Sequence, residues 1–479
     1  MLNSKSIQGI IALIVGTVLA IWIGFSLVTD QSETLLYLAA TSLVLISGLL
    51  GQRVWLLFLF FYAANVVLLM GFGSVQIGQM IFIGFSLLLF LMRKLKFTLS
   101  FGELEIWGLL LVASIVQAYL RNPVGLNLFG GSEVGGRPYV FMIIGITAAV
   151  ILSAYQVNPK DLKWAMRLSM LGIAIGIPSN VLRSGITLTE EGLSRIPALN
   201  SLGQLIAQWL VTRLSPLKAC LRPLWSLLLL ISIAAAAGSG YRNAIAGTGL
   251  IYAFGVLYWN GRGGLFASFI AIASFLSLLA IINLNFPLPG NIQRALSPFP
   301  GTWEEQYVKV ADDSTEWRQE MWIEALTSKR WIHNKILGDG IGFSKADLET
   351  NQRMKDMKIG KLANGMSAQQ EAMLINGSYH SGPVQTIRST GYVGMLILVL
   401  AMIRTAVHAH RQILRCRSTE WFPVALFFCI PIIILPIFFC LIFGEFSDGV
   451  RQTMMSIAMV KLLEKNLPLP RYTRIKPIR

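Results

Sequence analysis

Residues 422–443 read FPVALFFCIPIIILPIFFCLIF, a run without a single charged side chain. A helix that crosses the hydrocarbon core of a bilayer needs roughly 20 predominantly apolar residues. Runs of this kind recur along nearly the whole chain, which is 54% hydrophobic and only 13% charged, with a mean hydropathy of +0.62. This composition is too apolar for a soluble multidomain protein and predicts an all-α polytopic membrane protein.

The apolar runs predict about 14 transmembrane helices, since each is long enough, or nearly so, to cross a bilayer. The first lacks a small-residue cleavage site, so we expect an uncleaved anchor. The last is amphipathic and could instead lie on the membrane surface. The approximate spans are 7–28, 35–50, 54–70, 75–92, 104–120, 139–154, 164–177, 202–214, 224–238, 242–259, 264–284, 389–403, 422–443 and 450–463.

The basic residues predict the orientation, because Lys and Arg collect in short cytoplasmic connections. With the N-terminus inside, the cytoplasmic segments carry 22 basic residues and the short outer segments carry 6. We therefore expect both termini in the cytoplasm. The formal net charge of +16 then reflects membrane orientation, and nucleic acid is not an expected partner. The outer six are Arg121, Arg137, Arg183, Arg195, Arg242 and Arg451.

This orientation divides the chain into four regions. We expect transmembrane helices 1–11 in residues 1–284, an extracytoplasmic loop domain in 285–388, helices 12–14 in 389–463, and a basic cytoplasmic tail in 464–479. The loop carries 12 basic and 12 acidic residues and is therefore neutral. Within it, STEWRQEMWIEALTSKRWI (314–332) has the apolar spacing of an amphipathic helix. LGDGIGFSKADLET (337–350) predicts a glycine turn followed by a helix start.

Several kinds of chemistry have no sequence signal here. The four cysteines form neither a metal-ligand pattern nor a disulfide framework. HExxH, P-loop and GxSxG motifs are absent from the sequence. Asp30 and Glu33 could serve a metal-assisted transferase, but a solvated turn is the better interpretation. We expect no bound metal, nucleotide or other cofactor, and no serine nucleophile.

One histidine stands out at the membrane boundary, in INGSYHSGPVQTIRSTGYVG (375–394). His380 lies about two helical turns before Arg388 and just before an apolar helix. An imidazole titrates near neutrality, which suits a general base that takes a proton from a hydroxyl. Alternatively, it is an interfacial histidine that only hydrogen-bonds the loop. His408 and His410 are expected to be solvated residues of a cytoplasmic connection.

A second unusual stretch is AAAAGSGYRNAIAG (234–247). Its small residues permit close helix packing, and Arg242 falls at an expected outer helix start. A guanidinium beside free helix N–H groups can bind phosphate or diphosphate. Alternatively, Arg242 snorkels to the interface. Arg318 and Arg137, each taken alone, fit solvated or salt-bridged arginines.

Taken in order, these stretches resemble the O-antigen ligase and O-antigen polymerase superfamily of bacterial membranes. The shared pattern is GSGYR, then a long outer loop with WRQEMWIEAL and ILGDGIGF, then a histidine segment leading into GYVGMLILVL. The resemblance covers about residues 234–400. Two positions depart from it: Ser381 stands where members usually have Asn, and Tyr241 stands where many have Ser.

The resemblance implies a metal-independent GT-C-type glycosyltransferase in the bacterial inner membrane. Its donor would be an undecaprenyl-diphosphate-linked glycan and its acceptor a hydroxyl of a glycan or glycolipid. Arg242 and Arg318 would hold the diphosphate, with Arg137 and Arg388 as weaker candidates. His380 would activate or position the acceptor hydroxyl. Two other functions stay open, a transporter or flippase for lipid-linked glycans and a non-catalytic assembly protein.

Overall fold

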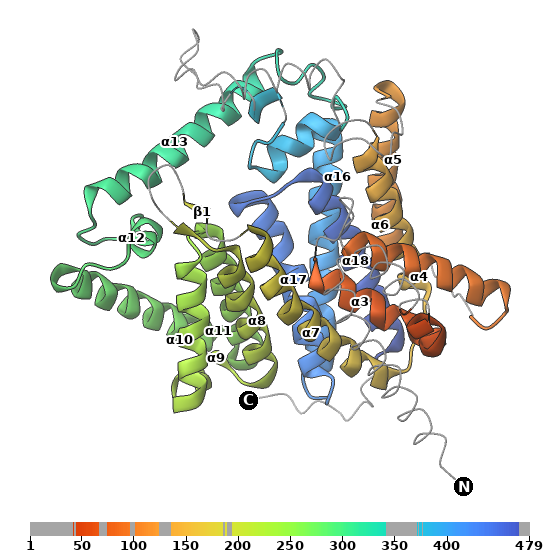
Figure 1. Cartoon of the computed structure of the whole chain (residues 1–479), viewed down its shortest axis with the longest axis horizontal. Helices are drawn as coiled ribbons and strands as arrows, with labels where there is room; N and C mark the ends of the chain where they lie inside the picture. The colour runs from red at the N-terminus through yellow and green to blue at the C-terminus, as the bar shows by residue number, and fades with distance from the viewer. Residues whose placement is uncertain are drawn as a thin grey trace, which may run out of the picture.

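The computed structural model describes residues 42, 45–66, 74–95, 101–123, 136–184, 187–188, 194–341, 371, 373–375 and 377–468, and these are almost entirely helical (Figure 1). Two short strands, β1 (Thr187–Leu188) and β2 (Ser194–Arg195), pair antiparallel. The helices include one 3₁₀ turn, η1, and one π-helix, η3. In chain order they are η1 (Gly51–Arg53), α3 (Val54–Ala64), α4 (Ser74–Leu91), α5 (Glu103–Arg121), α6 (Arg137–Ala154), α7 (Pro159–Ser184), α8 (Pro197–Arg213), α9 (Pro216–Cys220), α10 (Pro223–Gly238), α11 (Arg242–Asn285), α12 (Gly290–Leu296), α13 (Glu305–Thr327), α16 (Gly382–Cys416), α17 (Phe422–Ile437), η3 (Phe438–Ile442) and α18 (Phe446–Asn466).

Among the described residues, seven helices are long and apolar enough to cross a membrane. The prediction of an all-helical, polytopic membrane protein therefore agrees with the structure. The predicted number of about fourteen crossings goes beyond these seven helices. The first predicted span, 7–28, lies outside the described residues. The seven are Leu45–Ala64, Ser74–Leu91, Glu103–Arg121, Arg137–Ala154, Arg242–Asn285, Gly382–Cys416 and Phe422–Ile442.

Other sequence predictions also fall outside the described part of the chain. These are the acids Asp30 and Glu33, the helix start expected after residue 343, and the end of the basic tail. The expected break between spans 242–259 and 264–284 is present as a kink within α11. Gly261 interrupts this helix with a φ of 74°, a conformation that glycine adopts without steric cost.

Helix α16 is longer than the predicted span 389–403 and begins inside the region assigned to the outer loop. It starts at Gly382, so Arg388 is part of the helix. It also continues to Cys416, which corrects the prediction that two histidines lie in a connection between helices. The hydroxyl of Tyr258 lies 2.7 Å from Nδ1 of His410, and His408 sits between two carboxylates. Both rings contact neighbouring helices, but only His408 is largely shielded from solvent, with its side chain 18% exposed. His410 is exposed, as the sequence predicted.

The final helix, α18, packs inside the bundle, which corrects the alternative that it lies on the membrane surface. It packs against α6 and α16, and Val450, Val460 and Leu462 are fully buried. Its amphipathic pattern has another cause: its polar residues pair with other helices. Nζ of Lys461 lies 2.9 Å from a carboxylate oxygen of Glu105 on α5.

Segment 335–341 docks against α16 at the point where this helix breaks. Gly391 has a φ of 73°, and a side chain there would run into the backbone of Ile336. The backbone nitrogen of Asp339 donates to the carbonyl oxygen of Arg388 at 2.6 Å. The segment thus supplies a hydrogen bond at the place where the regular helical ladder is interrupted.

The same segment also contacts the end of α5 and the beginning of α6. The side-chain nitrogen of Asn122 donates to the carbonyl oxygen of Asp339 at 2.7 Å. The backbone nitrogen of Ile341 donates to the hydroxyl of Tyr139 at 2.8 Å. We call this end of the bundle, where α5 ends and α6 and α16 begin, the loop end.

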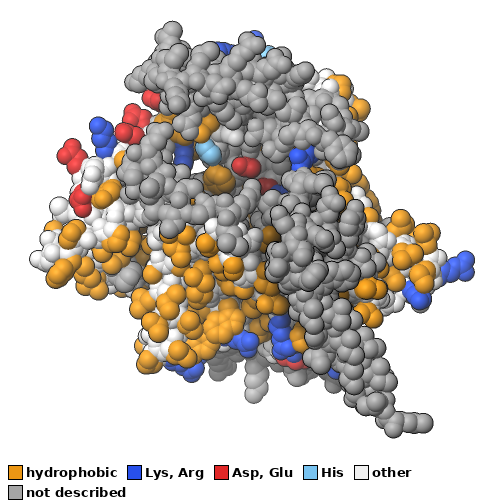
Figure 2. Space-filling view, in the orientation of Figure 1, with side chains coloured by type: hydrophobic (Ala, Val, Ile, Leu, Met, Phe, Trp, Pro, Cys, Tyr) orange, Lys and Arg blue, Asp and Glu red, His pale blue; other side chains and the backbone are white. Residues whose placement is uncertain are grey.

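The surface agrees with a membrane environment. Figure 2 shows a broad apolar band on this face, with charged side chains above it and basic side chains along its lower edge. Many exposed side chains on the helices are large and hydrophobic, and Phe266 and Phe269 on α11 are about 70% exposed. Exposed apolar area on this scale is unusual for a soluble protein and typical of a lipid-facing surface.

Candidate functional site

The amphipathic helix predicted within 314–332 is confirmed as part of α13, and it organises the candidate site. Its apolar face buries Met321 and Ala325. These side chains belong to a small hydrophobic core that also includes Tyr379 and Ile387. The core therefore ties α13 to the segment before α16 and to the first turns of α16. Helix α13 is held against the loop end by apolar packing.

Arg242 is the first residue of α11, as the sequence predicted, and it contacts α13. Its guanidinium donates to the hydroxyl of Thr315 at 3.4 Å and to the carbonyl oxygen of Ala311 at 3.5 Å. Thr315 lies three residues before Arg318, so the two are neighbours on one face of α13. The fold thus brings Arg242 to within one helical turn of Arg318 along α13.

His380 is held next to the same helix in a strained backbone conformation. Its φ is 52°, which is uncommon for a residue with a side chain. The indole N–H of Trp322 donates to the carbonyl oxygen of the preceding residue, Tyr379, at 2.6 Å. The imidazole contacts two aromatic rings, with centroid distances of 6.4 Å to Trp317 and 5.9 Å to Phe443. Trp317 directly precedes Arg318.

Tyr379 anchors this segment. Its side chain is fully buried, and burial raises the pKa of its hydroxyl, so the phenol stays protonated. The hydroxyl donates to the carbonyl oxygen of Leu374 at 3.4 Å. This buried, protonated tyrosine lies immediately before His380 and therefore anchors the backbone that carries the histidine.

Arg388, on α16, contacts the segment that precedes His380. Its guanidinium donates to the carbonyl oxygen of Ile375 at 2.9 Å. It also packs directly on Gly377, where any side chain would overlap the guanidinium. Gly377 has a φ of 69°, a second reason for glycine at this position. These contacts give Arg388 a role in holding the loop that carries His380.

Arg137 lies at the start of α6, also at the loop end, and is buried. Its guanidinium carbon lies 5.1 Å from the centre of the Phe141 ring on the same helix, which is a cation–π contact. Helix α6 packs mainly against α4 and α18. Arg137 thus lies at the loop end on a helix whose main neighbours are α4 and α18, whereas Arg242 contacts α13 directly.

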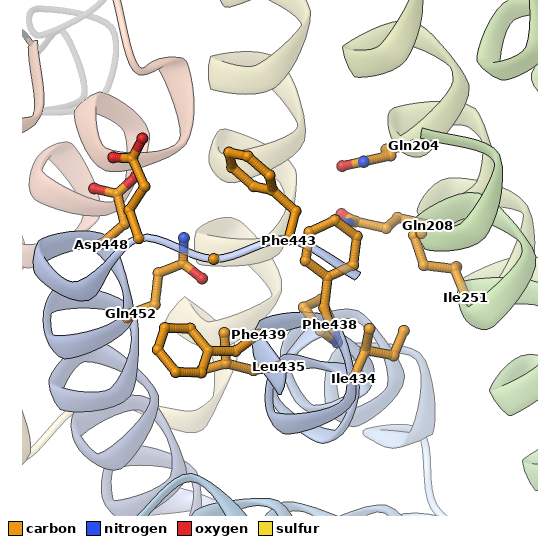
Figure 3. Close-up of a pocket in the computed structure, with 15 residues that line it drawn as sticks. Gln204, Gln208, Ile251, Ile434, Leu435, Phe438, Phe439, Phe443, Asp448 and Gln452 are labelled. Carbon is orange, nitrogen blue, oxygen red and sulfur yellow. The ribbon is translucent and has the colours of Figure 1, made fainter. Parts of the chain in front are cut away.

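A cavity of about 290 Å³ with both polar and apolar lining residues, which we call the polar cavity, opens beside Phe443 (Figure 3). It lies between α8, α11, α17, η3 and α18, and Phe443 connects it with His380 because this ring contacts both. Figure 3 shows glutamines on one side, Asp448 and Gln452 on the other, and phenylalanines between them. Its polar lining residues are Gln204, Gln208, Glu445, Asp448 and Gln452.

A second cavity, of about 490 Å³, is almost entirely apolar and lies between α10, α12 and both halves of α11. Ile245, one helical turn after Arg242, is among its lining residues, as is Leu276 beyond the kink. The cavity therefore runs along the apolar part of the bundle from a point close to Arg242. Its shape and lining suit a hydrocarbon chain.

At the opposite end of the bundle, charged side chains join α5, α16 and α18. Nδ1 of His408 lies 2.8 Å from a carboxylate oxygen of Glu464, and its Nε2 lies 3.3 Å from Glu103. Arg404 also pairs with Glu103. Sequence reasoning missed this cluster because it placed His408 in a connection between helices. Among the described residues, no group of three or more His, Cys, Asp or Glu side chains is arranged to hold a metal ion.

Sequence reasoning also missed the polar cavity. A signal was present: Gln204 and Gln208 are four residues apart within the expected span 202–214, and Asp448 and Gln452 are four residues apart around the start of the last expected span. Residues spaced by four share a helix face, so each pair marks a polar stripe. The sequence alone does not show that the two stripes face each other across one cavity. No protein-family model matches this chain, and no curated protein matches it significantly.

Proposed function

We propose that this protein is a metal-independent glycosyltransferase of the bacterial inner membrane, similar to O-antigen ligases and polymerases. It moves a glycan from undecaprenyl diphosphate to an acceptor hydroxyl at the outer face. The proposed architecture is GT-C-like, with about 14 transmembrane helices, both termini in the cytoplasm and the loop end outside. The observation that carries the proposal is the contact of Arg242 with α13 beside Arg318, on the helix that also contacts His380.

Arg242 and Arg318 are the proposed diphosphate ligands. Arginine stays charged at all relevant pH values and contacts phosphate oxygens through a planar fork. Arg242 adds its place at a helix N-terminus, where backbone N–H groups also favour an anion. Arg388, which supports the segment that carries His380, and Arg137 are weaker candidates for the same anion.

The apolar cavity next to Arg242 is the proposed place for the undecaprenyl chain. A carrier lipid needs a cationic group at the level of its diphosphate and an apolar surface for its isoprenoid tail. The tail would enter between α10 and α11, where the lining begins one turn beyond Arg242. Apolar contact of this kind contributes roughly 25 cal/mol for each Å² removed from water, or less when the tail comes from lipid.

The proposed reaction is a displacement at the anomeric carbon of the donor sugar. His380 accepts the proton of the acceptor hydroxyl, and the oxygen forms a new bond to the anomeric carbon. The bond from this carbon to the diphosphate oxygen breaks, and its electron pair leaves with undecaprenyl diphosphate. The two arginines stabilise the negative charge that develops on this leaving group. His380 contributes as a general base.

A transporter or flippase for lipid-linked glycans is the second candidate. The observation that favours it is the interruption of three helices: α11 at Gly261, α16 at Gly391, and α17 where it passes into the π-helix η3. Interrupted helices are common in transporters, and of these three breaks the one at η3 borders the polar cavity. The two functions differ in whether the sugar–diphosphate bond is cleaved.

Deletion of the gene, followed by analysis of surface glycans, tests the proposed function. A ligase predicts loss of all attached polymer, and a polymerase predicts acceptors capped with a single repeat. Surface glycans of normal amount and length would contradict both. A reporter fused at residue 340 should report an extracytoplasmic position, and a cytoplasmic signal there would contradict the orientation together with the chemistry.

A further inference from the structure

Two polar helix faces line the polar cavity beside Phe443. Their helices, α8 and α18, are not among the seven in the described part of the chain that are long and apolar enough to cross a membrane. Polar side chains that converge with aromatic rings on one cavity are typical of a ligand site. Here two helices each contribute a stripe with a spacing of four residues. Gln204 and Gln208 come from α8, and Asp448 and Gln452 come from α18. Figure 3 shows the two stripes on opposite sides of one space.

The floor of this cavity is aromatic and is shaped by a break in α17. Pro436 lies within α17 and has no N–H for the helical ladder. The chain then continues as the π-helix η3, a form that often marks functional sites. Phe438 and Phe439 of η3 and Phe443 after it all line the cavity. Close packing fixes this floor, because side chains at Gly382 or Gly449 would overlap Phe439.

We infer that this cavity binds a sugar ring of the acceptor glycan, an inference that rests on the proposed function. Amide groups donate and accept hydrogen bonds, and carboxylates accept them strongly, so the two stripes match the mixed donors and acceptors of sugar hydroxyls. The phenylalanine rings match the apolar C–H face of a sugar. A volume of about 290 Å³ is close to the lower end of small-molecule sites, which suits one sugar unit.

The charge of the cavity assigns it to the acceptor. Glu445 and Asp448 line it, and these acids disfavour the diphosphate of the donor. Asp448 also pairs with Arg451. Phe443 lines the cavity and contacts His380, so the proposed base lies one aromatic ring away from a sugar bound there. The hydroxyl that loses its proton belongs to the acceptor, which places the acceptor on this side.

The first test measures transfer kinetics with purified protein in vesicles, with donor and acceptor varied separately. Gln208→Leu and Gln452→Leu should each raise KM for the acceptor about three- to tenfold, the effect of one lost hydrogen bond. The donor KM and kcat should stay within about twofold. Gln306→Leu is the control, because this exposed glutamine lies on α13 away from the cavity. A rise in the donor KM alone, or no change in either KM, would overturn the inference.

The second test does not depend on activity. In Gln208→Cys, alkylation of the new thiol is followed by peptide mass spectrometry with and without millimolar oligosaccharides released from the surface glycan. We expect at least threefold slower alkylation with oligosaccharide, and no change at Gln306→Cys. Equal rates in Gln208→Cys would overturn the inference even where the wild-type enzyme transfers glycan. Protection without any transfer by the wild type would keep the sugar site and reject the proposed function.

Discussion

Arg242, at the first position of α11, donates from its guanidinium to the hydroxyl of Thr315 at 3.4 Å, across a sequence separation of 73 residues. Thr315 lies on α13 three residues before Arg318, and Trp317 of the same helix contacts His380. One amphipathic helix thus links the two arginines with the histidine. This arrangement is what an enzyme needs if the diphosphate and the acceptor hydroxyl are to meet at one anomeric carbon beside α13.

The first prediction concerns His380. If its imidazole is a general base, His380→Ala should lower the transfer rate roughly 10²–10⁴-fold while protein abundance stays normal. His333→Ala is the matched control, because the side chain of His333 is 79% exposed. Surface glycan and protein level are measured together in a complemented deletion strain. Full glycan output from His380→Ala at normal abundance would reject the base assignment.

The second prediction concerns Arg242. An ammonium cannot reproduce the forked contact of a guanidinium with a diphosphate, so Arg242→Lys should lower kcat/KM for the donor at least about tenfold. Arg213→Lys, at an exposed position in the last turn of α8, should be close to wild type. Donor kinetics in vesicles provide the measurement. Equal donor kinetics for Arg242→Lys and wild type would remove Arg242 from the site.

The third prediction concerns Trp322, which positions His380 through the backbone of Tyr379. Trp322→Phe keeps a ring but removes the N–H that donates to Tyr379, so kcat should fall about three- to tenfold with little change in either KM. Trp303→Phe is the control, since Trp303 donates to the carbonyl oxygen of Phe299 in the connection before α13. If both variants lowered kcat equally, the effect would be general and the positioning role would be wrong.

Much of the fold could be predicted because apolar runs of helical length directly reflect burial in a membrane. The start of α11 at Arg242 followed from small residues before an arginine, and part of α13 followed from its apolar spacing. The ends of α16 could not be predicted. Its break at Gly391 is stabilised by segment 335–341, and no local pattern reveals such a distant partner.

The candidate site was only partly predictable for the same reason. The residue types at Arg242, Arg318 and His380 suggested their chemistry, but their link through α13 depends on tertiary packing. Gln204 and Gln208 fall within the predicted span 202–214 because the surrounding residues dominate its hydropathy. Their significance emerges only when α18 places Asp448 and Gln452 across the cavity.

The fourth prediction tests the docking of segment 335–341. Gly391→Ala adds a side chain that meets the backbone of Ile336 and disfavours the positive φ, so the protein should lose at least about 1 kcal/mol of stability. Gly84→Ala is the control, because a side chain there meets no atom within 4 Å. Thermal unfolding in detergent should show a lower Tm for Gly391→Ala only. Equal Tm values would contradict the importance of this break.

The most direct measurement follows the carrier itself in proteoliposomes that contain the purified protein, the acceptor and the undecaprenyl-diphosphate-linked glycan, with a chelator present. The account predicts that one undecaprenyl diphosphate is released for each glycan joined to the acceptor, and that His380→Ala and Arg242→Lys both slow this release. Movement of intact carrier-linked glycan across the bilayer, without release of undecaprenyl diphosphate, would contradict the account and favour a flippase.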